Sequence, residues 1–383
     1  MKKTTLFFIL CFTIFTVFSQ GSSEPLPVSW GLNMEATPDI VHLPALDFEY
    51  IINQDNINDQ DKSMPWRYGI EIPFRLNIQN EGLWTVLPNG GKIWQAIIQS
   101  SDAVNMSMNF DEFFLPEGSR LQLFNNEHTD ITSTFTSSQN REDGQIGTWF
   151  VEGDIVWIEY YQPPKTQGVP NLQIKSVIHG YRMSNVTTML NGQRGINESG
   201  DCNYDVNCSI GSDFDQKKDL LKKAVALLNL GNGYLCTSTL VNNTRNDKTP
   251  FLLTANHCLE NSDPSFWSLR FNWVSPNPVC GTGDDSGDAQ TNFTISGAKL
   301  QANNSLSDFA LVKLYDAIPP SWDVAFAGWD NSDTNPLFEV GIHHPQGDVM
   351  KICRDDSGAQ KVDANGTKVW LIGGGSQGSG NGW

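Results

Sequence analysis

Short apolar runs separated by turn residues fill the chain from about residue 66 to residue 182. Residues 82–87, 92–98 and 154–161 are examples, and glycine, proline or asparagine lies close to the ends of each run. Runs of this length between turn signals are typical of the short strands of an antiparallel sandwich. The pattern therefore predicts a β-sandwich over roughly residues 66–182, a segment that contains no cysteine.

The segments on either side of this predicted sandwich are polar. Residues 21–65 are strand-poor and include an acidic, amide-rich run at 53–61, which we interpret as a linker. A calcium-binding loop is excluded there because the required glycine and terminal glutamate are missing. Residues 183–200 are rich in Asn, Gly and Ser, and we expect them to be exposed and open to proteolytic nicking.

Two further segments bear on the C-terminal part of the chain. The periodicity of residues 220–230 allows a helix, but the apolar run at 224–228 before Asn229 and Gly231 also suits a buried strand, which we favour. Residues 373–383 are rich in Gly and Ser and predict no core element. Because a domain rarely finishes in this way, we expect the sequence to be truncated.

The first residues have the features of a secretory signal peptide. Lys2 and Lys3 precede an apolar run at residues 6–18, and small or polar residues follow at 19–21. The run is too short for a comfortable transmembrane helix, and no later run is long enough. We therefore expect a soluble, secreted product, with no membrane contact after signal removal.

Cysteine positions indicate a second folded unit. Of the 7 cysteines, Cys11 lies in the signal-like run, and the remaining 6 fall between Cys202 and Cys353. In an exported protein, such clustering predicts a disulfide-stapled C-terminal domain. The length of 383 residues also favours two folded units, and 12 Trp and 21 Phe supply enough apolar area for their cores.

Net charge narrows the class of partner. The formal net charge is −18 at pH 7, and no basic stripe offsets it. A nucleic-acid partner is therefore excluded, because a polyanion would be repelled. The acidity otherwise indicates only solubility.

The strongest chemical signal is an apolar strand that ends in the sequence Thr254-Ala255-Asn256-His257-Cys258. This segment resembles the histidine signature of trypsin-like serine proteases, in which the imidazole removes the proton of the nucleophilic serine. Cys236 is placed upstream where a bridge to Cys258 would fix the histidine turn. A histidine beside a cysteine is otherwise more often structural or a metal ligand.

Asp308 is the second signal, because it directly precedes the apolar run at residues 309–312. The segment resembles the Asp-Phe-Ala-Leu sequence of the same proteases, where the carboxylate orients the histidine. Taken alone, Asp308 would more often be a solvated turn residue. The order His257 then Asp308, 51 residues apart, is the order that a chymotrypsin-like fold requires.

A narrower resemblance follows from residues 200–208, 236–244 and 343–348, which are similar to bacterial lysyl endopeptidases. The resemblance implies that the preceding sandwich is a propeptide. It also implies two disulfides, which join Cys236 to Cys258 and Cys208 to Cys280. The partner of Cys202 would then follow the nucleophile in the sequence. Cys353 has no family counterpart, and is either a buried thiol or an alternative partner of Cys202.

No serine has the expected context of a nucleophile, which in this family resembles Gly-Ser-Ser-Gly-Ser-Pro. Ser286 precedes Asp308, which breaks the order of the fold, and Ser357 follows the segment 343–348 too closely. Ser376 and Ser379 lie in a Gly-rich run without the flanking residues of the motif. We therefore expect that the serine lies beyond Trp383 and that this chain has negligible peptidase activity.

Adjacent His343 and His344 suggest a metal site. Neighbouring side chains on a strand point to opposite faces, so the pair would make poor joint ligands, and we expect a structural loop role. The sequence therefore predicts no metal and no cofactor.

These observations together predict an all-β protein, with an N-terminal antiparallel β-sandwich propeptide followed by an incomplete chymotrypsin-like double β-barrel. The expected division is a signal peptide at 1–20, a linker at 21–65, a propeptide at 66–195 and a protease domain at 196–383. The predicted function is that of a secreted serine endopeptidase zymogen.

The expected partners are protein or peptide substrates and the chain's own propeptide, and we expect a monomer. Specificity for Lys or Arg is only an analogy, because the pocket residues of these enzymes flank and follow the serine. Two alternatives are a catalytically dead pseudo-protease and a secreted β-sandwich protein for binding or adhesion.

Overall fold

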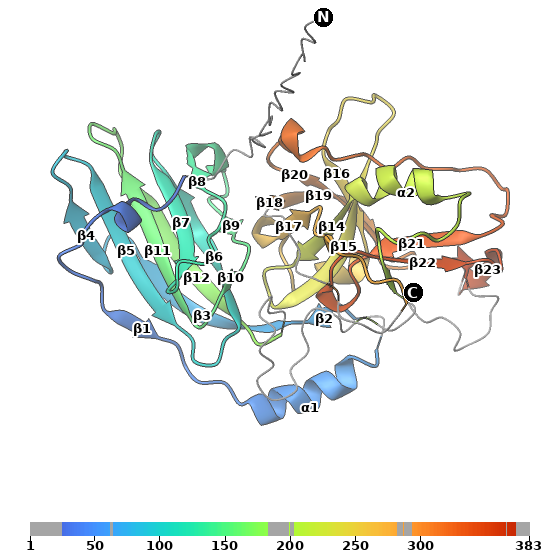
Figure 1. The fold of residues 1–383 in the computed structure, drawn as a ribbon, viewed down its shortest axis with the longest axis horizontal. Helices are drawn as coiled ribbons and strands as arrows, with labels where there is room; N and C mark the ends of the chain where they lie inside the picture. The colour runs from blue at the N-terminus through green and yellow to red at the C-terminus, as the bar shows by residue number, and fades with distance from the viewer. Residues whose placement is uncertain are drawn as a thin grey trace, which may run out of the picture.

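Two β-rich units lie side by side in the computed structural model of this protein (Figure 1). The structure describes residues 25–61, 64–182, 199, 203–281, 286, 293–364 and 366–372. We call the part up to residue 182 the N-terminal unit and the part from residue 203 the C-terminal unit. The predicted signal peptide and most of the 183–200 segment lie outside the described residues.

The N-terminal unit is a sandwich of two sheets. One sheet has the order β1-β5-β11-β7-β8, with β4 paired to β5, and the other has the order β10-β6-β12-β3, with β9 paired to β6. All pairs are antiparallel except β1 with β5, which is parallel and lies at a sheet edge. The strands are β1 (Ile40–His42), β3 (Gly69–Asn77), β4 (Leu83–Val86), β5 (Lys92–Gln99), β6 (Asn105–Phe114), β7 (Arg120–Asn125), β8 (Phe135–Thr136), β9 (Ile146–Gly147), β10 (Val151–Glu152), β11 (Ile155–Gln162) and β12 (Asn171–Gly180).

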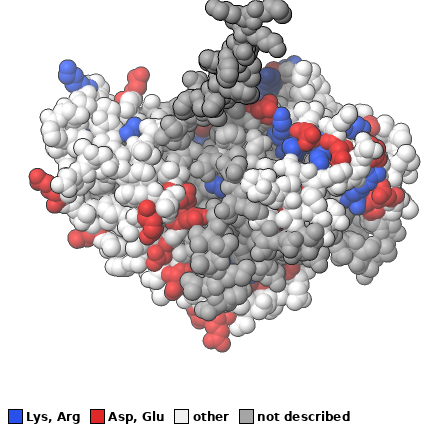
Figure 2. All heavy atoms as spheres, in the orientation of Figure 1, with Lys and Arg blue, Asp and Glu red and all other residues white. Residues whose placement is uncertain are grey.

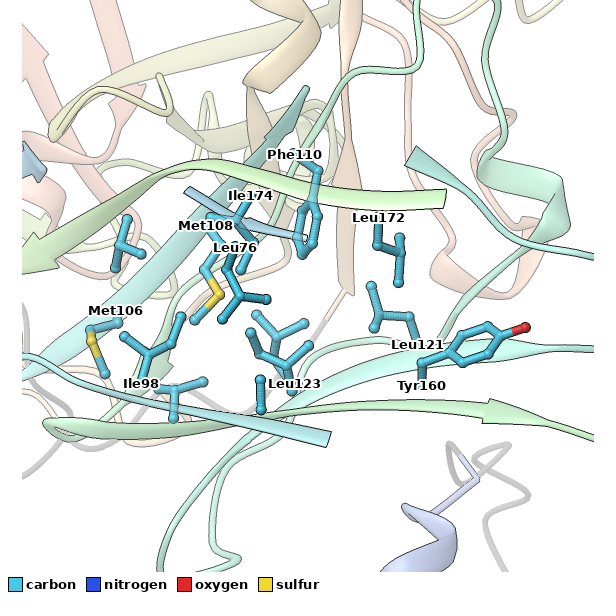
Figure 3. Packing of buried hydrophobic residues seen from close by; sticks show 14 of the residues in the cluster. Leu76, Ile98, Met106, Met108, Phe110, Leu121, Leu123, Tyr160, Leu172 and Ile174 are labelled. Carbon is cyan, nitrogen blue, oxygen red and sulfur yellow. The ribbon is translucent and has the colours of Figure 1, made fainter. Parts of the chain in front are cut away.

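Alternating side chains of the two sheets meet in one core. Figure 3 shows Leu76, Phe110 and Ile174 from one sheet facing Ile98 and Leu123 from the other, and all five side chains are buried. Because successive residues of a strand point to opposite faces, each strand contributes every second residue to this layer. The apolar runs of the sequence are therefore the inner faces of the sandwich.

The predicted linker at 21–65 contains regular structure that the sequence did not indicate. Besides β1 and the 3₁₀ turn η1 (Val28–Gly31), it includes helix α1 (Phe48–Asn58), which covers part of the amide-rich run. The side chain of Asp47 caps α1 by accepting a hydrogen bond from the Tyr50 N–H. The helix is weakly amphipathic, and packing of its buried Ile51 and Asp55 against other elements fixes it.

The main sheet of the C-terminal unit curls into a barrel. Its order is β18-β17-β14-β15-β16-β20-β19, with β2 also paired to β15. The two end strands, β18 and β19, are separated only by Gly297, so the sheet must bend back on itself. The strands are β2 (Trp66–Arg67), β14 (Val225–Asn229), β15 (Tyr234–Val241), β16 (Phe251–Thr254), β17 (Ser268–Phe271), β18 (Phe293–Ser296), β19 (Ala298–Asn304) and β20 (Phe309–Leu314).

A smaller sheet and a hairpin complete the described part of this unit. The smaller sheet has the order β13-β22-β21, and β23 pairs with β24. Their bounds are β13 (Tyr204–Asp205), β21 (Glu339–His343), β22 (Lys351–Asp355), β23 (Gln360–Ala364) and β24 (Thr367–Leu371). The predicted all-β class is confirmed: a sandwich precedes one barrel-like sheet and an incomplete second one.

The segment at 220–230, for which the sequence allowed a helix or a strand, contains both. Helix α2 (Asp215–Leu221) and the 3₁₀ turn η3 (Lys222–Ala224) precede β14, so the favoured strand begins only at Val225.

None of the helical segments described in the structure has the length and apolar character that a bilayer crossing requires. On the face shown in Figure 2, the basic side chains of the C-terminal unit lie among acidic ones. Arg354 and Asp213 of this unit form an ion pair at 2.8 Å.

Buried polar and aromatic contacts join the two units. Arg270 of β17 lies over the ring of Trp149 of the N-terminal unit, 4.8 Å from the ring centroid, and is buried. Burial lowers the pKa of Arg270 to about 10, so the guanidinium remains charged at neutral pH. The Tyr68 hydroxyl donates to Asn229 Oδ1 at 3.2 Å, and Asn109 Nδ2 donates to the Gly231 carbonyl at 2.7 Å. The units therefore share a packed, specific interface.

We predict that acid destabilises the N-terminal unit through His179. This side chain is buried beside Ser100, and burial lowers its pKa from 6.5 to about 4. Between pH 6.5 and 4 the His179 imidazole is protonated in the unfolded chain but neutral in the folded chain. The free energy of unfolding therefore falls as the pH drops from 6.5 to 4. The slope is at most about 1.4 kcal/mol per pH unit for one histidine.

Urea unfolding of His179→Gln at several pH values checks this expectation. The pH dependence between 6.5 and 4 should flatten relative to the wild type, whatever the change in absolute stability. His42→Gln, at an exposed position on β1, is the matched control and should keep the wild-type slope. An unchanged slope in His179→Gln would contradict the assignment.

Candidate active site

A short turn after β16 presents His257. The strand ends at Thr254, and residues Asn256–Leu259 form the 3₁₀ turn η4. The Thr254 hydroxyl donates to the Thr237 carbonyl at 2.9 Å, which ties the end of β16 to β15. The Cys236–Cys258 disulfide, with a Cα–Cα distance of 6.5 Å, makes a second connection between the same two segments. These restraints fix the backbone that carries the imidazole.

Asp308 holds His257 through both of its carboxylate oxygens. Oδ2 lies 2.8 Å from Nδ1 of the imidazole, and Oδ1 accepts a hydrogen bond from the backbone N–H of His257 at 2.9 Å. The Asp308 carbonyl also accepts from the Asn256 N–H at 3.1 Å. A carboxylate facing Nδ1 requires the proton there, so Nε2 keeps its lone pair and can act as a general base.

The backbone of Asp308 is unusual. Its φ of +48° lies in the left-handed region, which Asp adopts more readily than most residues but still at some cost. It directly precedes β20, whose pairing with β16 sets Ala310 opposite Thr254. The adjacent strands therefore bring together two residues that are 51 positions apart in the sequence.

His257 opens onto a pocket of about 270 Å³ beside β15 and the turn that follows β21. On one side lie residues of β15 and the histidine turn, and on another lie His344, Gln346 and Gly347. Met64, Pro65 and Trp66 of the N-terminal unit also line this pocket; sequence reasoning missed them, because a short apolar segment carries no signal of which distant strand it packs against. The His257 side chain is 25% exposed and that of Asp308 is 49% exposed.

His343 and His344 have different surroundings. His343 is the last residue of β21, whereas His344 is buried and stacked on Trp273. Its Nδ1 lies 2.9 Å from the Asp348 carbonyl, and its backbone N–H donates to the Thr237 hydroxyl. Burial lowers the pKa of His343 to about 4 and that of His344 to about 3, so both are neutral near pH 7. His344 therefore supports the loop beside His257.

The sulfurs of Cys236 and Cys258 lie close to the imidazole of His257. A metal ion would require thiolates there, but the two sulfurs are bonded to one another. This group therefore provides a rigid turn and no metal ligands.

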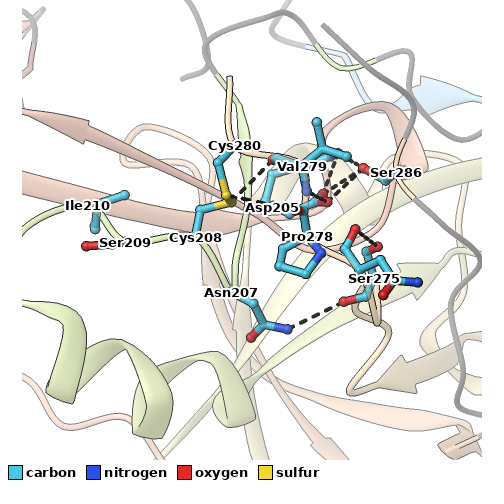
Figure 4. The surroundings of a disulfide bond; sticks show 12 residues. Asp205, Asn207, Cys208, Ser209, Ile210, Ser275, Pro278, Val279, Cys280 and Ser286 are labelled. Atoms are coloured by element: carbon cyan, nitrogen blue, oxygen red, sulfur yellow. Dashed lines mark hydrogen bonds and ion pairs between the residues drawn. A yellow bond between two sulfur atoms is a disulfide. The ribbon is translucent and has the colours of Figure 1, made fainter. Parts of the chain in front are cut away.

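The second disulfide, Cys208–Cys280, anchors the start of the C-terminal unit (Figure 4). Its Cα–Cα distance is 5.7 Å, and the neighbouring Asp205 accepts a hydrogen bond from the Val279 N–H at 2.7 Å. Cys353 is buried on β22. Cys202 lies outside the described residues, so the question of its partner stays open.

The structure gives Ser286 a structural role. Its hydroxyl donates to Asp205 at 2.8 Å, and Lys351 Nζ donates to the same hydroxyl at 3.0 Å. Lys351 also forms buried ion pairs with Asp205 and Asp348. Sequence reasoning missed this buried cluster, although Asp348 belongs to the motif at 343–348, because its members are far apart in the chain.

No serine lines the pocket of His257 within the part of the chain that the structure describes. Ser357 is exposed, and its hydroxyl donates to Asp355 at 2.6 Å. Ser376 and Ser379 fall outside the described residues. The described residues therefore supply a hydrogen-bonded His257–Asp308 pair beside this pocket.

Comparisons with known proteins agree with a protease. Residues 196–382 match the sequence model of the family described as lysyl endopeptidase, C-terminal domain. A curated lysyl endopeptidase of Pseudomonas aeruginosa is 28% identical over 253 residues, which cover 60% of this chain and 52% of that protein. The matched region therefore spans about half the length of this curated relative. Together, these matches support a serine-type protease as the class of the chain.

Among solved structures, the MamO protease domain from Magnetospirillum magneticum in its apo form has a TM-score of 0.25 and 10% sequence identity. The match covers 39% of this chain and 69% of that one. In sequence, the C-terminal unit is similar to the C-terminal domain of lysyl endopeptidases.

We predict that the two disulfides differ in their effect on His257. Closing loops of 22 and 72 residues should stabilise the protein by about 3 and about 4 kcal/mol respectively. Only Cys236–Cys258 restrains the histidine turn directly, so Cys236→Ser/Cys258→Ser should also loosen the hydrogen bond between His257 and Asp308.

Denaturant unfolding measures the stability, and the low-field proton resonance of His257 Nδ1–H reports the hydrogen bond. The matched control is Cys208→Ser/Cys280→Ser, which should lose stability but keep the resonance. Equal loss of the resonance in both variants would contradict a local role for Cys236–Cys258.

Proposed function

We propose that the chain is the precursor of a secreted serine endopeptidase, with His257 as the general base and Asp308 as its orienting carboxylate. The observation that supports this most strongly is that one carboxylate accepts hydrogen bonds from both the ring and the backbone of His257. An isolated structural histidine needs neither the free Nε2 nor the strained aspartate. Two disulfides in the C-terminal unit support an oxidising, extracellular location.

The proposed reaction is acyl transfer to a serine. Nε2 of His257 takes the hydroxyl proton as the serine oxygen attacks the peptide carbonyl, and the imidazolium then gives that proton to the departing amine. Water completes the cycle by attacking the acyl-enzyme with the same histidine as base. Asp308 remains ionised throughout and stabilises the imidazolium. No metal or cofactor enters this scheme.

In this proposal the serine follows Trp383. The family match runs to residue 382 and the curated relative is about twice as long as the matched region, which supports a nucleophile outside the given sequence. Cleavage after lysine is proposed from the printed name of that relative alone. The N-terminal unit is proposed to be the propeptide, removed by cleavage between residues 183 and 202.

The test is hydrolysis of peptides by the chain extended with its own downstream coding sequence. We expect cleavage after a basic residue, and a loss in kcat of about 10⁶-fold for His257→Ala and about 10⁴-fold for Asp308→Asn. The exposed Asp330→Asn is the matched control and should keep wild-type activity. The 383-residue chain alone should be inactive.

Two results would contradict this function. Full activity of His257→Ala would remove the histidine from the mechanism. A stop codon directly after Trp383 in the gene would favour a pseudo-protease or a β-sandwich binding protein instead.

A further inference from the structure

Strand β2 of the N-terminal unit is also a strand of the C-terminal barrel. It pairs antiparallel with β15, with Trp66 opposite Leu235 and Arg67 opposite Tyr234. The backbone N–H groups of Tyr68 and Gly69 both donate to the Gly233 carbonyl, at 2.8 and 3.1 Å. Addition of an extended segment to a free strand edge is a general way for proteins to bind peptides.

Among the described residues, no strand other than β2 pairs with this edge. On that side of β15, strand β16 pairs only with Thr239, Leu240 and Val241, whereas β14 runs along the other side. The start of β15 would therefore present free backbone groups if β2 were absent. Pro65 precedes β2 and has no N–H, so the ladder cannot extend through it.

This edge lies beside the proposed general base. Leu235 is followed by Cys236, which is bonded to Cys258 next to His257. Met64, Pro65 and Trp66 line the pocket into which His257 opens. An extended peptide bound to this edge would therefore pass the imidazole, and residues 64–67, which we call the strap, already occupy that path.

A buried ionic group holds the strap in place. Arg67 Nε donates to Asp55 of helix α1 at 2.8 Å and to the Tyr181 hydroxyl at 3.0 Å. Arg182 forms a second ion pair with Asp55 at 2.7 Å, and the Asp55 side chain is 1% exposed. Breaking a buried pair leaves an uncompensated charge, which is strongly unfavourable. The strap is thus fastened to α1 and to the segment after β12.

We propose that the strap is an intramolecular inhibitor that occupies the peptide-binding edge of β15. The ligand that the edge takes is an extended peptide segment, and the N-terminal unit supplies the first such segment itself. Helix α1, within the predicted linker, is the anchor of this device. The inference rests on the proposed function, because it assigns the edge to the substrates of that activity.

Binding of a peptide in trans tests the proposal without requiring the nucleophile. The probe is a fluorescently labelled synthetic peptide with the sequence of residues 61–70, and fluorescence anisotropy measures its affinity. The full chain carrying Met64→Gly, Pro65→Gly and Trp66→Gly should bind the probe at least tenfold more tightly than the wild type. Trp329→Gly, an exposed tryptophan outside the pocket, is the control and should bind as weakly as the wild type.

Near-UV circular dichroism verifies that the variants are folded. If the triple variant does not fold, Trp66→Gly alone replaces it, and hydrogen exchange of residues 234–237 is measured alongside. Faster exchange there, with unchanged exchange in the sandwich core, is the expected result. Equal affinities of wild type and variant for the probe, or no binding by either, would overturn the proposal.

This result is separable from that of the activity assay. If the variant binds the peptide but the extended chain does not hydrolyse peptides, the strap proposal stands and the peptidase proposal is rejected. Hydrolysis by an extended, uncleaved chain at the rate of the strap variant would reject the strap and leave the peptidase.

Discussion

The site depends on one interaction, the two hydrogen bonds that the Asp308 carboxylate accepts from His257. It joins the turn after β16 to the start of β20, and the pairing of those strands sets its length. The carboxylate selects the tautomer that leaves Nε2 unprotonated. The disulfide at Cys258 and the left-handed backbone of Asp308 add rigidity on either side. Without this arrangement, His257 would be a partly exposed histidine on a loop.

The second constraint is the close contact of the two units. Gly233 illustrates it, because a Cβ built there would lie 2.2 Å from the Gly69 carbonyl oxygen, so a side chain would separate β2 from β15. Arg270 places a buried charge among aromatic rings of both units. Close backbone packing and a buried charge therefore hold the two units together.

Local sequence patterns predicted much of the fold and part of the site. Alternating apolar runs predicted the sandwich, and the residues around His257 and Asp308 predicted a base and its orienting partner. Patterns failed where tertiary contacts outweigh local preference. Helix α1 forms in an amide-rich run because Asp55 is buried against two arginines, which no local pattern reveals. No local pattern reveals the buried cluster around Lys351 either, because its members come from distant parts of the chain.

The sequence by itself determined the all-β class, because short apolar runs and turn residues specify strands. It also predicted two units, and its short motifs indicated His257 and Asp308 as candidate site residues. Only the tertiary structure decided that His257 and Asp308 share two hydrogen bonds, that Ser286 belongs to a buried ionic cluster, and that residues 64–67 lie beside the site. The physical reason is that hydrogen bonding and burial depend on distances between segments far apart in the chain. A pattern of residue types specifies faces and turns but not which faces meet.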